Sequence, residues 1–341
     1  MRNGVSVVAL GMLMALAAMA AGAEPPLRVR AQNFTVLPST GPVTHVVVKN
    51  RLTADYTGTL RVQFPAGWKV TPAQHALALR PGEIQKLAFT IERGADVKTN
   101  AYPVRILVEG SGGAMQVEQW VHCASFPYNK PVIDGELAEW KDSIPITFAT
   151  AGRNTTLSGY WSGKQFALAV EVEEDRLIGV KEAGAGPGLD AVQFALSPAE
   201  GEGRWEFLIA AADAAASTGQ CYLLCKPGQD AALAGQRRSL AGLEFMEAKV
   251  AVKRDGKVTR YEVSVPFARM PELKPTAGRE FFFSLLVHDP GDTGVRDLGE
   301  VMNLWPEDRP PGGWCSWEFV RWGDKTPWSS RIEFGFCSSI H

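Results

Sequence analysis

The sequence predicts an all-β protein built from two β-sandwich domains, and three observations lead to this prediction. Short runs of β-branched and aromatic residues recur along the chain, and turn residues separate them. The chain holds 34 glycines and 22 prolines among 341 residues, which favours many turns and short elements. The N-terminal half shows no helical periodicity. Hydrophobic residues make up 45% and charged residues 21%, which excludes a disordered chain.

The charge balance argues against nucleic acid as a partner. Lys and Arg number 35 against 37 Asp and Glu, a formal net charge of −2. Proteins that bind nucleic acid carry a basic patch or stripe, and no such excess is present here.

Residues 1–23 are predicted to be a signal peptide. Arg2 supplies a positive start, residues 5–20 are apolar, and Ala21-Gly22-Ala23 offers the small residues of a cleavage site. The apolar run is short for a bilayer, and no second run of spanning length follows. We therefore expect a secreted or periplasmic protein without a membrane span.

Residues 24–123 are predicted to form the first sandwich. Strands are expected at 43–48, 60–64, 77–79, 84–91, 102–108 and 115–121. Turn residues at 65–68, 80–83 and 110–113 separate them, as in an antiparallel sandwich.

Three segments of this domain resemble the Ig-like accessory domain associated with α-galactosidases. They are a strand ending in Asn at 46–50, the turn Pro65-Ala66-Gly67-Trp68 and the turn Arg80-Pro81-Gly82-Glu83 before a hydrophobic strand. The resemblance implies a scaffold rather than an activity. Trp68 is expected to fill the core, with contact to a ligand as the alternative.

Residues 124–130 are predicted to be a linker and 131–341 a second sandwich. Strands are expected at 144–148, 155–160, 165–172, 191–196, 205–210, 243–252, 258–265 and 281–287. Single helical turns are expected at 137–141 and 266–270, and the Ala-rich segment 211–218 is either a helix or a loop.

The second domain resembles the family 9 carbohydrate-binding modules. Residues 131–140 match its opening P-x-I-D-G-x-x-x-E-W, Tyr160-Trp161 its aromatic turn, 189–194 its x-D-S-V-E segment and 261–267 its Y-x-x-x-x-P strand. Residues 328–335 match its closing W…FG segment. The resemblance implies a jelly-roll-like sandwich that binds a polysaccharide or oligosaccharide.

In that family a sugar ring lies between two tryptophans, because its C–H faces stack on aromatic planes. Trp328 corresponds to one of them, whereas the place of the other, near Pro187, holds no aromatic residue. Gln193 stands where the family has an acidic residue that binds sugar hydroxyls.

A tryptophan-rich segment could replace the missing aromatic. Five of the ten tryptophans lie between 305 and 328, and the Pro- and Gly-rich stretch 306–313 among them predicts a surface loop. Trp314 is therefore a second candidate stacking platform. The alternative is that these tryptophans, Trp317 and Trp322 above all, close the end of the sandwich.

The same resemblance implies a structural calcium ion. Asp175, after the strand at 165–172, and Asp190, before the strand at 191–196, are the predicted ligands, with Glu173 and Glu174 beside them. Calcium takes six to eight oxygen ligands, many of them carboxylates. The residues Asp134, Glu136 and Glu139 form a second candidate group, and either group could be a solvated acidic turn.

No catalytic motif is recognisable. The chain has no G-x-S-x-G elbow, no HExxH and no marked pair of carboxylates for glycoside hydrolysis. Cys221 and Cys225 have the spacing of half a zinc site, but no Cys/His pair completes it, so buried thiols or one local disulfide are expected.

The sequence therefore predicts a secreted, non-catalytic carbohydrate-binding protein. A structural or adhesion module of the cell surface is the alternative. A haem-binding sandwich is a further one, with His288 and Met302 as the iron ligands.

Overall fold

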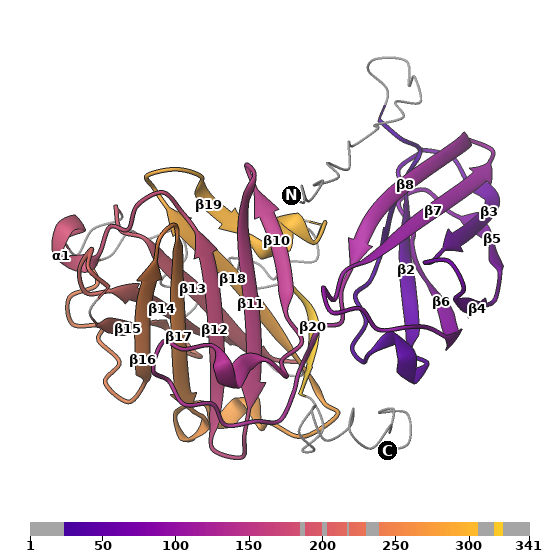
Figure 1. Cartoon of the computed structure of the whole chain (residues 1–341). Coiled ribbons are helices and arrows are strands. Elements are labelled where there is room, and N and C mark those ends of the chain that lie inside the picture. Colours follow the sequence, from indigo (N-terminus) through magenta and orange to yellow (C-terminus); the bar gives the residue numbers. More distant parts are fainter. Residues whose placement is uncertain are drawn as a thin grey trace, which may run out of the picture.

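In the computed structural model, described residues are 24–184, 188–199, 203–216, 218–229 and 239–305, together with the backbone of 317–322. The strands form two β-sandwiches that follow one another along the chain (Figure 1). The all-β prediction is confirmed. The predicted signal peptide lies outside the described residues, and among those described no helix is long and apolar enough to cross a membrane.

The first sandwich contains two four-stranded antiparallel sheets, in the orders β1-β2-β6-β4 and β5-β3-β7-β8. Its strands are β1 (Leu27–Ala31), β2 (Val43–Asn50), β3 (Tyr56–Gln63), β4 (Lys69–Thr71), β5 (Gln74–Leu79), β6 (Ile84–Arg93), β7 (Tyr102–Gly110) and β8 (Gly113–Val121). Trp68 packs against the core beside Phe34, Phe64 and Tyr102, as predicted for a core residue. The resemblance to the α-galactosidase-associated domain stays a prediction.

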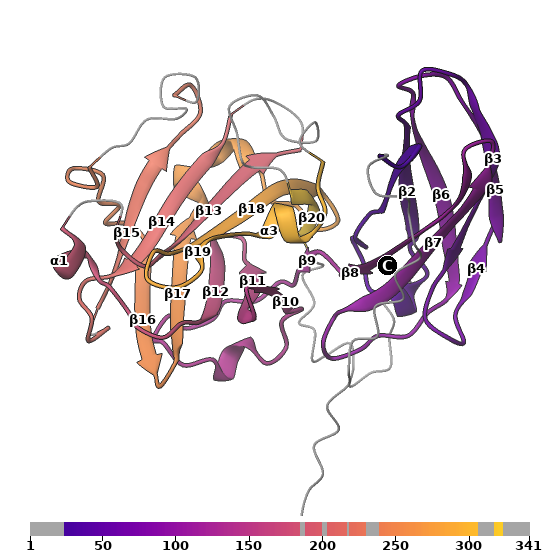
Figure 2. The ribbon, with the colours of Figure 1, turned by 90° about the horizontal axis from the view of Figure 1, so that it is seen from above.

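The second sandwich contains a five-stranded sheet, β10-β11-β12-β17-β16, and a larger sheet, β15-β14-β13-β18-β20-β9, with β19 also paired to β18. The strands are β9 (Ser125–Phe126), β10 (Ile146–Thr150), β11 (Arg153–Trp161), β12 (Gln165–Glu173), β13 (Ala191–Pro198), β14 (Trp205–Ala211), β15 (Gly219–Cys225), β16 (Lys249–Asp255), β17 (Val258–Pro266), β18 (Glu280–Asp289), β19 (Gly294–Asp297) and β20 (Trp317–Trp322). Figure 2 shows the two sheets of this sandwich from above, with the first sandwich beside them.

Among the residues that the structure describes, helical structure is confined to single turns. These are α1 (Val180–Ala183), α3 (Leu298–Val301) and the 3-10 turns η1 (Pro38–Thr40), η2 (Ala138–Trp140), η3 (Phe267–Arg269) and η4 (Pro271–Leu273). The turns expected at 137–141 and 266–270 are therefore confirmed, and residues 212–216 form turns and loop rather than a helix. The strand expected at 243–252 begins only at Lys249, because residues 243–248 cover the edge of the larger sheet, where Phe245 donates a backbone hydrogen bond to Cys221.

The predicted linker 124–130 belongs to the second sandwich. β9 pairs in parallel with β20, and the Phe126 ring is fully buried against Phe166, Phe281 and Phe283. Gly159 makes room for this ring, because a Cβ there would lie 2.5 Å from it. Phe126 is apolar, and its burial in the core fixes the segment that was expected to be a linker.

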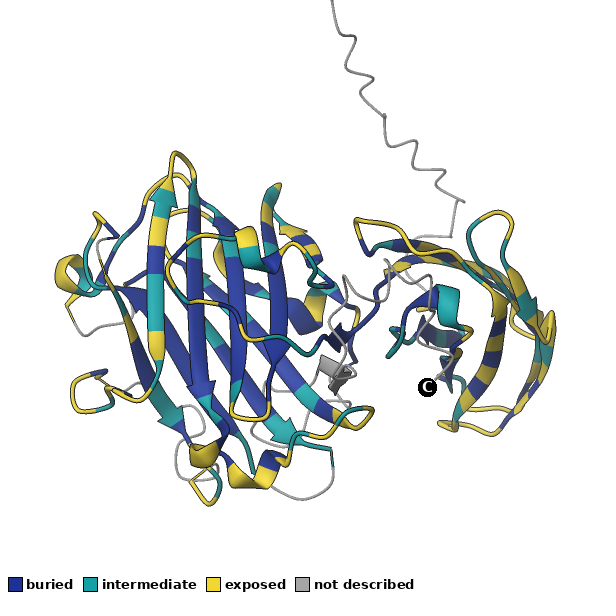
Figure 3. Cartoon of the chain, turned by 60° about the horizontal axis from the view of Figure 1, so that its bottom comes forward, coloured by how far each residue is buried: buried dark blue, intermediate teal, exposed yellow. Residues whose placement is uncertain are grey.

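The two sandwiches differ in how their outer faces are covered (Figure 3). In the first, strands such as β6 and β7 alternate buried and exposed residues, so one face of each sheet is open to solvent. In the second, β12 and β14 are buried almost throughout. Residues 133–140 cover the outer face of β11 and β12 with a small apolar cluster that contains Trp140, Tyr160, Ala167 and Ala169.

Candidate functional site

Three buried carboxylates meet at one end of the second sandwich, between its two sheets. Glu174 follows β12, Asp190 precedes β13, and Asp289 is the last residue of β18. One oxygen from each lies within 4.8 Å of the others, and all three residues are buried. We call Glu174, Asp190 and Asp289 the carboxylate cluster.

Alternation along the strands explains why these side chains point inward. Val170 and Val172 of β12 face the core, and Glu174 continues their row. Val192 and Phe194 continue the row of Asp190, and Leu285 and Val287 lead to Asp289. Each acid therefore occupies the end of an inward-facing row, where the next side chain still points between the sheets.

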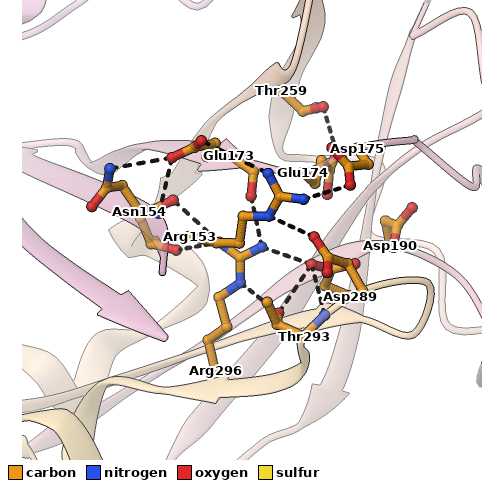
Figure 4. Close-up of polar contacts among 12 residues, drawn as sticks. Arg153, Asn154, Glu173, Glu174, Asp175, Asp190, Thr259, Asp289, Thr293 and Arg296 are labelled. Atoms are coloured by element: carbon orange, nitrogen blue, oxygen red, sulfur yellow. Dashed lines mark hydrogen bonds and ion pairs between the residues drawn. The ribbon is translucent and has the colours of Figure 1, made fainter. Parts of the chain in front are cut away.

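Two arginines donate hydrogen bonds to the cluster, and Figure 4 shows one of them, Arg296, beside Asp289. Arg254 donates to Glu174 at 3.0 Å, and the fully buried Arg296 donates to Asp289 at 2.7 Å. Thr259 also donates to Glu174, and Thr293 to Asp289. Arg176 also acts on Asp190 through its charge, so three guanidinium groups lie near the three carboxylates.

Burial and the repulsion among the three acids raise the free energy needed to ionise the cluster. Burial, the largest cause, raises the pKa of Glu174 to about 7, and the nearby charge of Asp190 adds to it. Burial likewise raises the pKa of Asp190 to about 6, with Asp289 adding to the shift.

Two oxygens of the cluster are buried and accept no hydrogen bond. They are Oε2 of Glu174 and Oδ1 of Asp190. A buried polar atom without a partner costs about 1–3 kcal/mol, more if it is charged. Carboxylate oxygens so arranged are the donors that a hard cation such as calcium prefers, so the residues fit such an ion.

Asp175, the other predicted calcium ligand, lies apart from the cluster. Its half-exposed side chain accepts hydrogen bonds from Arg153 and from Lys257, the latter at 2.7 Å. The Lys257 hydrogen bond is the main reason that the pKa of Asp175 is lowered. The structure thus brings Asp190 together with Glu174 and Asp289, and Asp289 is the residue that the sequence analysis missed.

The second candidate acidic group is not gathered into a site. Glu136 pairs with Lys253 at 2.6 Å on the surface. Asp134 accepts a hydrogen bond from the backbone of Glu136, which closes a local turn. Glu139, the third member, has a buried Oε2 without a hydrogen-bond partner. Among the described residues, the oxygens of these three acids do not come close enough to share a metal ion.

The segment 131–140, which resembles the opening motif of the family 9 modules, instead has a structural partner, Glu262 of β17. Its carboxylate accepts hydrogen bonds from the backbone N–H groups of Asp134 and Gly135 at 3.0 and 2.9 Å and from the Trp140 indole at 3.0 Å. Trp140 also stacks on Tyr160, with ring centroids 5.0 Å apart. We call these contacts the Glu262 latch.

Gln193 lies on the outer face of the larger sheet, opposite the core. Its side chain hydrogen-bonds His288 of β18 at 2.7 Å and donates to Glu206 of β14. Glu206 also accepts from Arg204 at 3.0 Å. These four residues form a polar row, the Gln193 row, on a face that is partly covered by the buried apolar cluster of Leu189, Ala191, Leu208, Ala210, Tyr222 and Leu240.

The same geometry separates the two candidate haem ligands. His288 points to the outer face and binds Gln193, whereas Met302 is buried in the core between the sheets. They lie on opposite sides of the larger sheet, so they do not form a pair of axial ligands.

The two predicted stacking tryptophans, Trp328 and Trp314, lie outside the described residues, as does Pro187. Trp305, from the same tryptophan-rich segment, is buried, with the guanidinium groups of Arg28 and Arg30 at 4.9 and 5.5 Å from its ring centroid. Cys221 is buried with a free thiol, and burial raises its pKa to about 12.

Comparison with known proteins gives distant structural likenesses alone. No protein-family profile matches the chain, and no curated protein matches its sequence. A family 9 carbohydrate-binding module from Caldicellulosiruptor kristjanssonii in complex with glucose aligns at 16% identity over 51% of this chain and 82% of its own, with a TM-score of 0.35. The same module with cellotriose aligns at 14% identity over 51% of this chain and 80% of its own, with a TM-score of 0.34. A FixG-related protein from Vibrio parahaemolyticus aligns at 14% identity over 29% of this chain and 96% of its own, with a TM-score of 0.22.

Proposed function

We propose that this chain is an exported, non-catalytic carbohydrate-binding protein. Its ligand is a polysaccharide or oligosaccharide, held on the outer face of the larger sheet by the Gln193 row. Trp328 and Trp314 supply the stacking surfaces. Export follows from the signal-peptide pattern of residues 1–23.

The Gln193 row is the observation that carries this proposal. Sugar hydroxyls both donate and accept hydrogen bonds. An amide and a neutral imidazole can also do both, whereas an ionised carboxylate accepts and a guanidinium donates. The row crosses three neighbouring strands, because Gln193 pairs with Leu208 of β14 and with Leu286 of β18, so its polar atoms are held on a rigid sheet. The family resemblance of the sequence supports the same face, since Gln193 stands at the hydroxyl-binding position of that family.

Binding to a panel of immobilised glycans, followed by calorimetry with the soluble form of any hit, tests the proposal. Gln193→Ala and Trp328→Ala should each weaken binding about tenfold or more while the melting temperature stays within a few degrees. Gln74→Ala, which removes an exposed amide of the first sandwich, is the control and should bind as the wild type does. A protein that binds no glycan would leave the structural or adhesion role as the better account.

We further propose that the carboxylate cluster holds a structural calcium ion. Glu174, Asp190 and Asp289 would bind it, and the two buried oxygens without partners support this assignment. The ion would offset the mutual repulsion of the three carboxylates. Elemental analysis of the purified protein and a melting curve after dialysis against EDTA test it. A stable, metal-free protein with an unchanged curve would remove calcium from the account.

A further inference from the structure

The first sandwich carries one exposed aromatic ring among the residues that the structure describes. Trp120 of β8 leaves 59% of its surface accessible, although tryptophan is usually highly buried. β8 is the outermost strand of its sheet, and Trp120 lies on the outer face, opposite Pro103 of β7. The core does not use this ring.

Ordered polar side chains accompany Trp120 on the same face. Glu118 and Gln116 precede it at two-residue steps, so they share its face at intervals of about 6.8 Å. Glu118 accepts from Gln116 at 3.1 Å and from Arg105 of β7 at 2.9 Å. An indole plane and a row of donors and acceptors therefore lie side by side on one strand pair. We call Arg105, Gln116, Glu118 and Trp120 the Trp120 face.

Strand β8, which carries this face, is attached to the rest of the sandwich by a side chain on its opposite, inward-facing side. Gln119 points the other way and bonds the backbone of Ala31 in β1 twice, through its amide oxygen at 3.0 Å and its amide nitrogen at 2.8 Å. This link ties β8 to the opposite sheet of the sandwich. The backbone that carries Trp120 is thus held in place before any ligand arrives, which lowers the entropic cost of binding.

The charges on this face cancel. Arg105 and Glu118 form an ion pair at 2.8 Å, and Gln116 is neutral. A ligand that suits such a surface is uncharged, has a flat apolar side for the indole and carries hydroxyl groups for the polar row. A pyranose ring combines these properties, because its C–H face stacks on an aromatic plane and its equatorial hydroxyls reach outward.

A groove beside the face offers room for more than one ring. It has a volume of about 560 Å³, and Glu118 lines it together with Arg28, Asp297, Glu300 and Asn303. Its walls come from β1 and β8 of the first sandwich and from the segment around α3 of the second. Glu118 is the residue of the Trp120 face that also lines the groove, so the two surfaces adjoin at that residue.

We propose that the Trp120 face is a second glycan-binding site, which stacks a pyranose ring of a neutral oligosaccharide. The inference rests on the proposed function and extends it to the first sandwich. The full-length mature chain would then have two sites on different domains, and a polysaccharide long enough to reach both would bind more tightly than a short oligosaccharide.

Calorimetry with cellohexaose, xylohexaose, mannohexaose and maltohexaose tests the proposal on the mature full-length protein. Wild type should bind one of them at two sites per chain. Trp120→Ala should lose one site, or weaken it about tenfold or more, with an unchanged melting temperature because the ring is exposed. Trp120→Phe should retain part of the affinity, and Ile84→Ala, which trims an exposed apolar side chain of β6, should bind as the wild type does.

The outcomes separate this inference from the proposed function. If Gln193→Ala abolishes all binding and Trp120→Ala changes none, the second site is wrong and the first stands. If wild type binds no glycan, the proposed function fails with it. If Trp120→Ala leaves sugar binding intact and converts a dimer into a monomer in light scattering, the face is an interface between copies of this chain.

Discussion

At the scale of single residues, orientation at a strand end decides which acid belongs to the cluster. Glu174 and Asp175 are neighbours in sequence, yet Glu174 is buried beside Arg254 and Asp175 pairs with surface cations. A strand turns successive side chains to opposite faces, so adjacent acids meet different environments. Asp175 is consequently a natural control for Asp190.

Asp190→Asn should remove the response of the protein to calcium. We expect its melting temperature to be the same in calcium and in EDTA, because an amide is a weaker ligand than a carboxylate for this ion. In the wild type, calcium at a hundred times its dissociation constant should add about 2.7 kcal/mol to the free energy of unfolding. Asp175→Asn should respond as the wild type does. An equal loss in both variants would place the ion elsewhere.

The raised pKa values make the calcium-free protein sensitive to pH. Those of Glu174, about 7, and Asp190, about 6, exceed the values of roughly 4.3 and 3.9 expected in the unfolded chain. Between about pH 4 and 7 the native state therefore binds more protons than the unfolded state. This contribution to the free energy of unfolding is present at low pH and is lost as pH rises through that window.

Glu174→Gln separates this effect from other titrating groups. Without calcium, its melting temperature relative to wild type should rise as the buffer is changed from about pH 5 to about pH 8, because the wild-type carboxyl becomes charged and the amide does not. Saturating calcium should reverse the order at the higher pH. A difference between the two proteins that stays constant with pH would show that Glu174 does not titrate in this range.

At the scale of elements, the Glu262 latch fastens the segment before β10 to the middle of the five-stranded sheet. Glu262 lies on β17 between the core residues Tyr261 and Val263, so its side chain points to the outer face. There it satisfies two backbone donors and one indole. The apolar cluster of Trp140, Tyr160, Ala167 and Ala169 then closes over this outer face.

Glu262→Ala should destabilise the protein by about 3 kcal/mol or more. Hydrogen bonds to a charged group contribute about 1.5–3 kcal/mol each, and three buried donors would lose their acceptor together. Chemical denaturation measures the change. Glu171→Ala, on the neighbouring strand, removes a carboxylate whose partner Arg260 lies 3.5 Å away at the surface, and should cost less than about 1 kcal/mol. If the two variants lost the same free energy of unfolding, the Glu262 latch would contribute no more to stability than a surface ion pair.

At the scale of the whole molecule, the connection between the sandwiches is a structural part of the second one. Asn100 of the first sandwich donates to the carbonyl groups of Cys123 and Pro145, at 3.0 and 2.9 Å, and so fixes the chain where it crosses over. Beyond that point, β9 and Phe126 enter the second core. A domain boundary placed at residue 131 would remove both.

Two fragments of the second sandwich test this boundary. A fragment of residues 124–341 keeps Phe126, and a fragment of residues 131–341 lacks it. Removal of a buried phenylalanine costs about 3–5 kcal/mol, and each kcal/mol lowers the melting temperature of a domain of this size by about 2–4 °C. The shorter fragment should therefore melt clearly earlier in circular dichroism. In the full chain, Phe126→Ala should be destabilised and Lys130→Ala should not. Equal melting of the two fragments would restore 124–130 as a linker.

Local patterns determined the all-β class and most of the strands. Segments such as 165–172 and 258–265 show the two-residue alternation of apolar and polar side chains that is typical of a strand. Glycine and proline mark the turns between the strands. Six strands were missed: β1, β4, β9, β15, β19 and β20. Three of them, β4, β9 and β19, have only two to four residues, which are too few to show a period, and their pairing is set by distant partners.

The sequence by itself placed acids at the ends of the inward-facing rows of β12, β13 and β18, since Glu174, Asp190 and Asp289 each continue a run of alternate core residues. Only the tertiary structure decided that these three ends meet. They lie as far as 115 positions apart along the chain, from 174 to 289. Glu174 follows a strand of the five-stranded sheet, whereas Asp190 and Asp289 lie at the ends of neighbouring strands of the larger sheet. The two sheets pack face to face across the whole core, and this packing brings the oxygens of the three carboxylates close to one another. The same packing explains why Glu174 is buried and Asp175 is half-exposed, because the burial of a side chain at a strand end depends on which other residues pack against it.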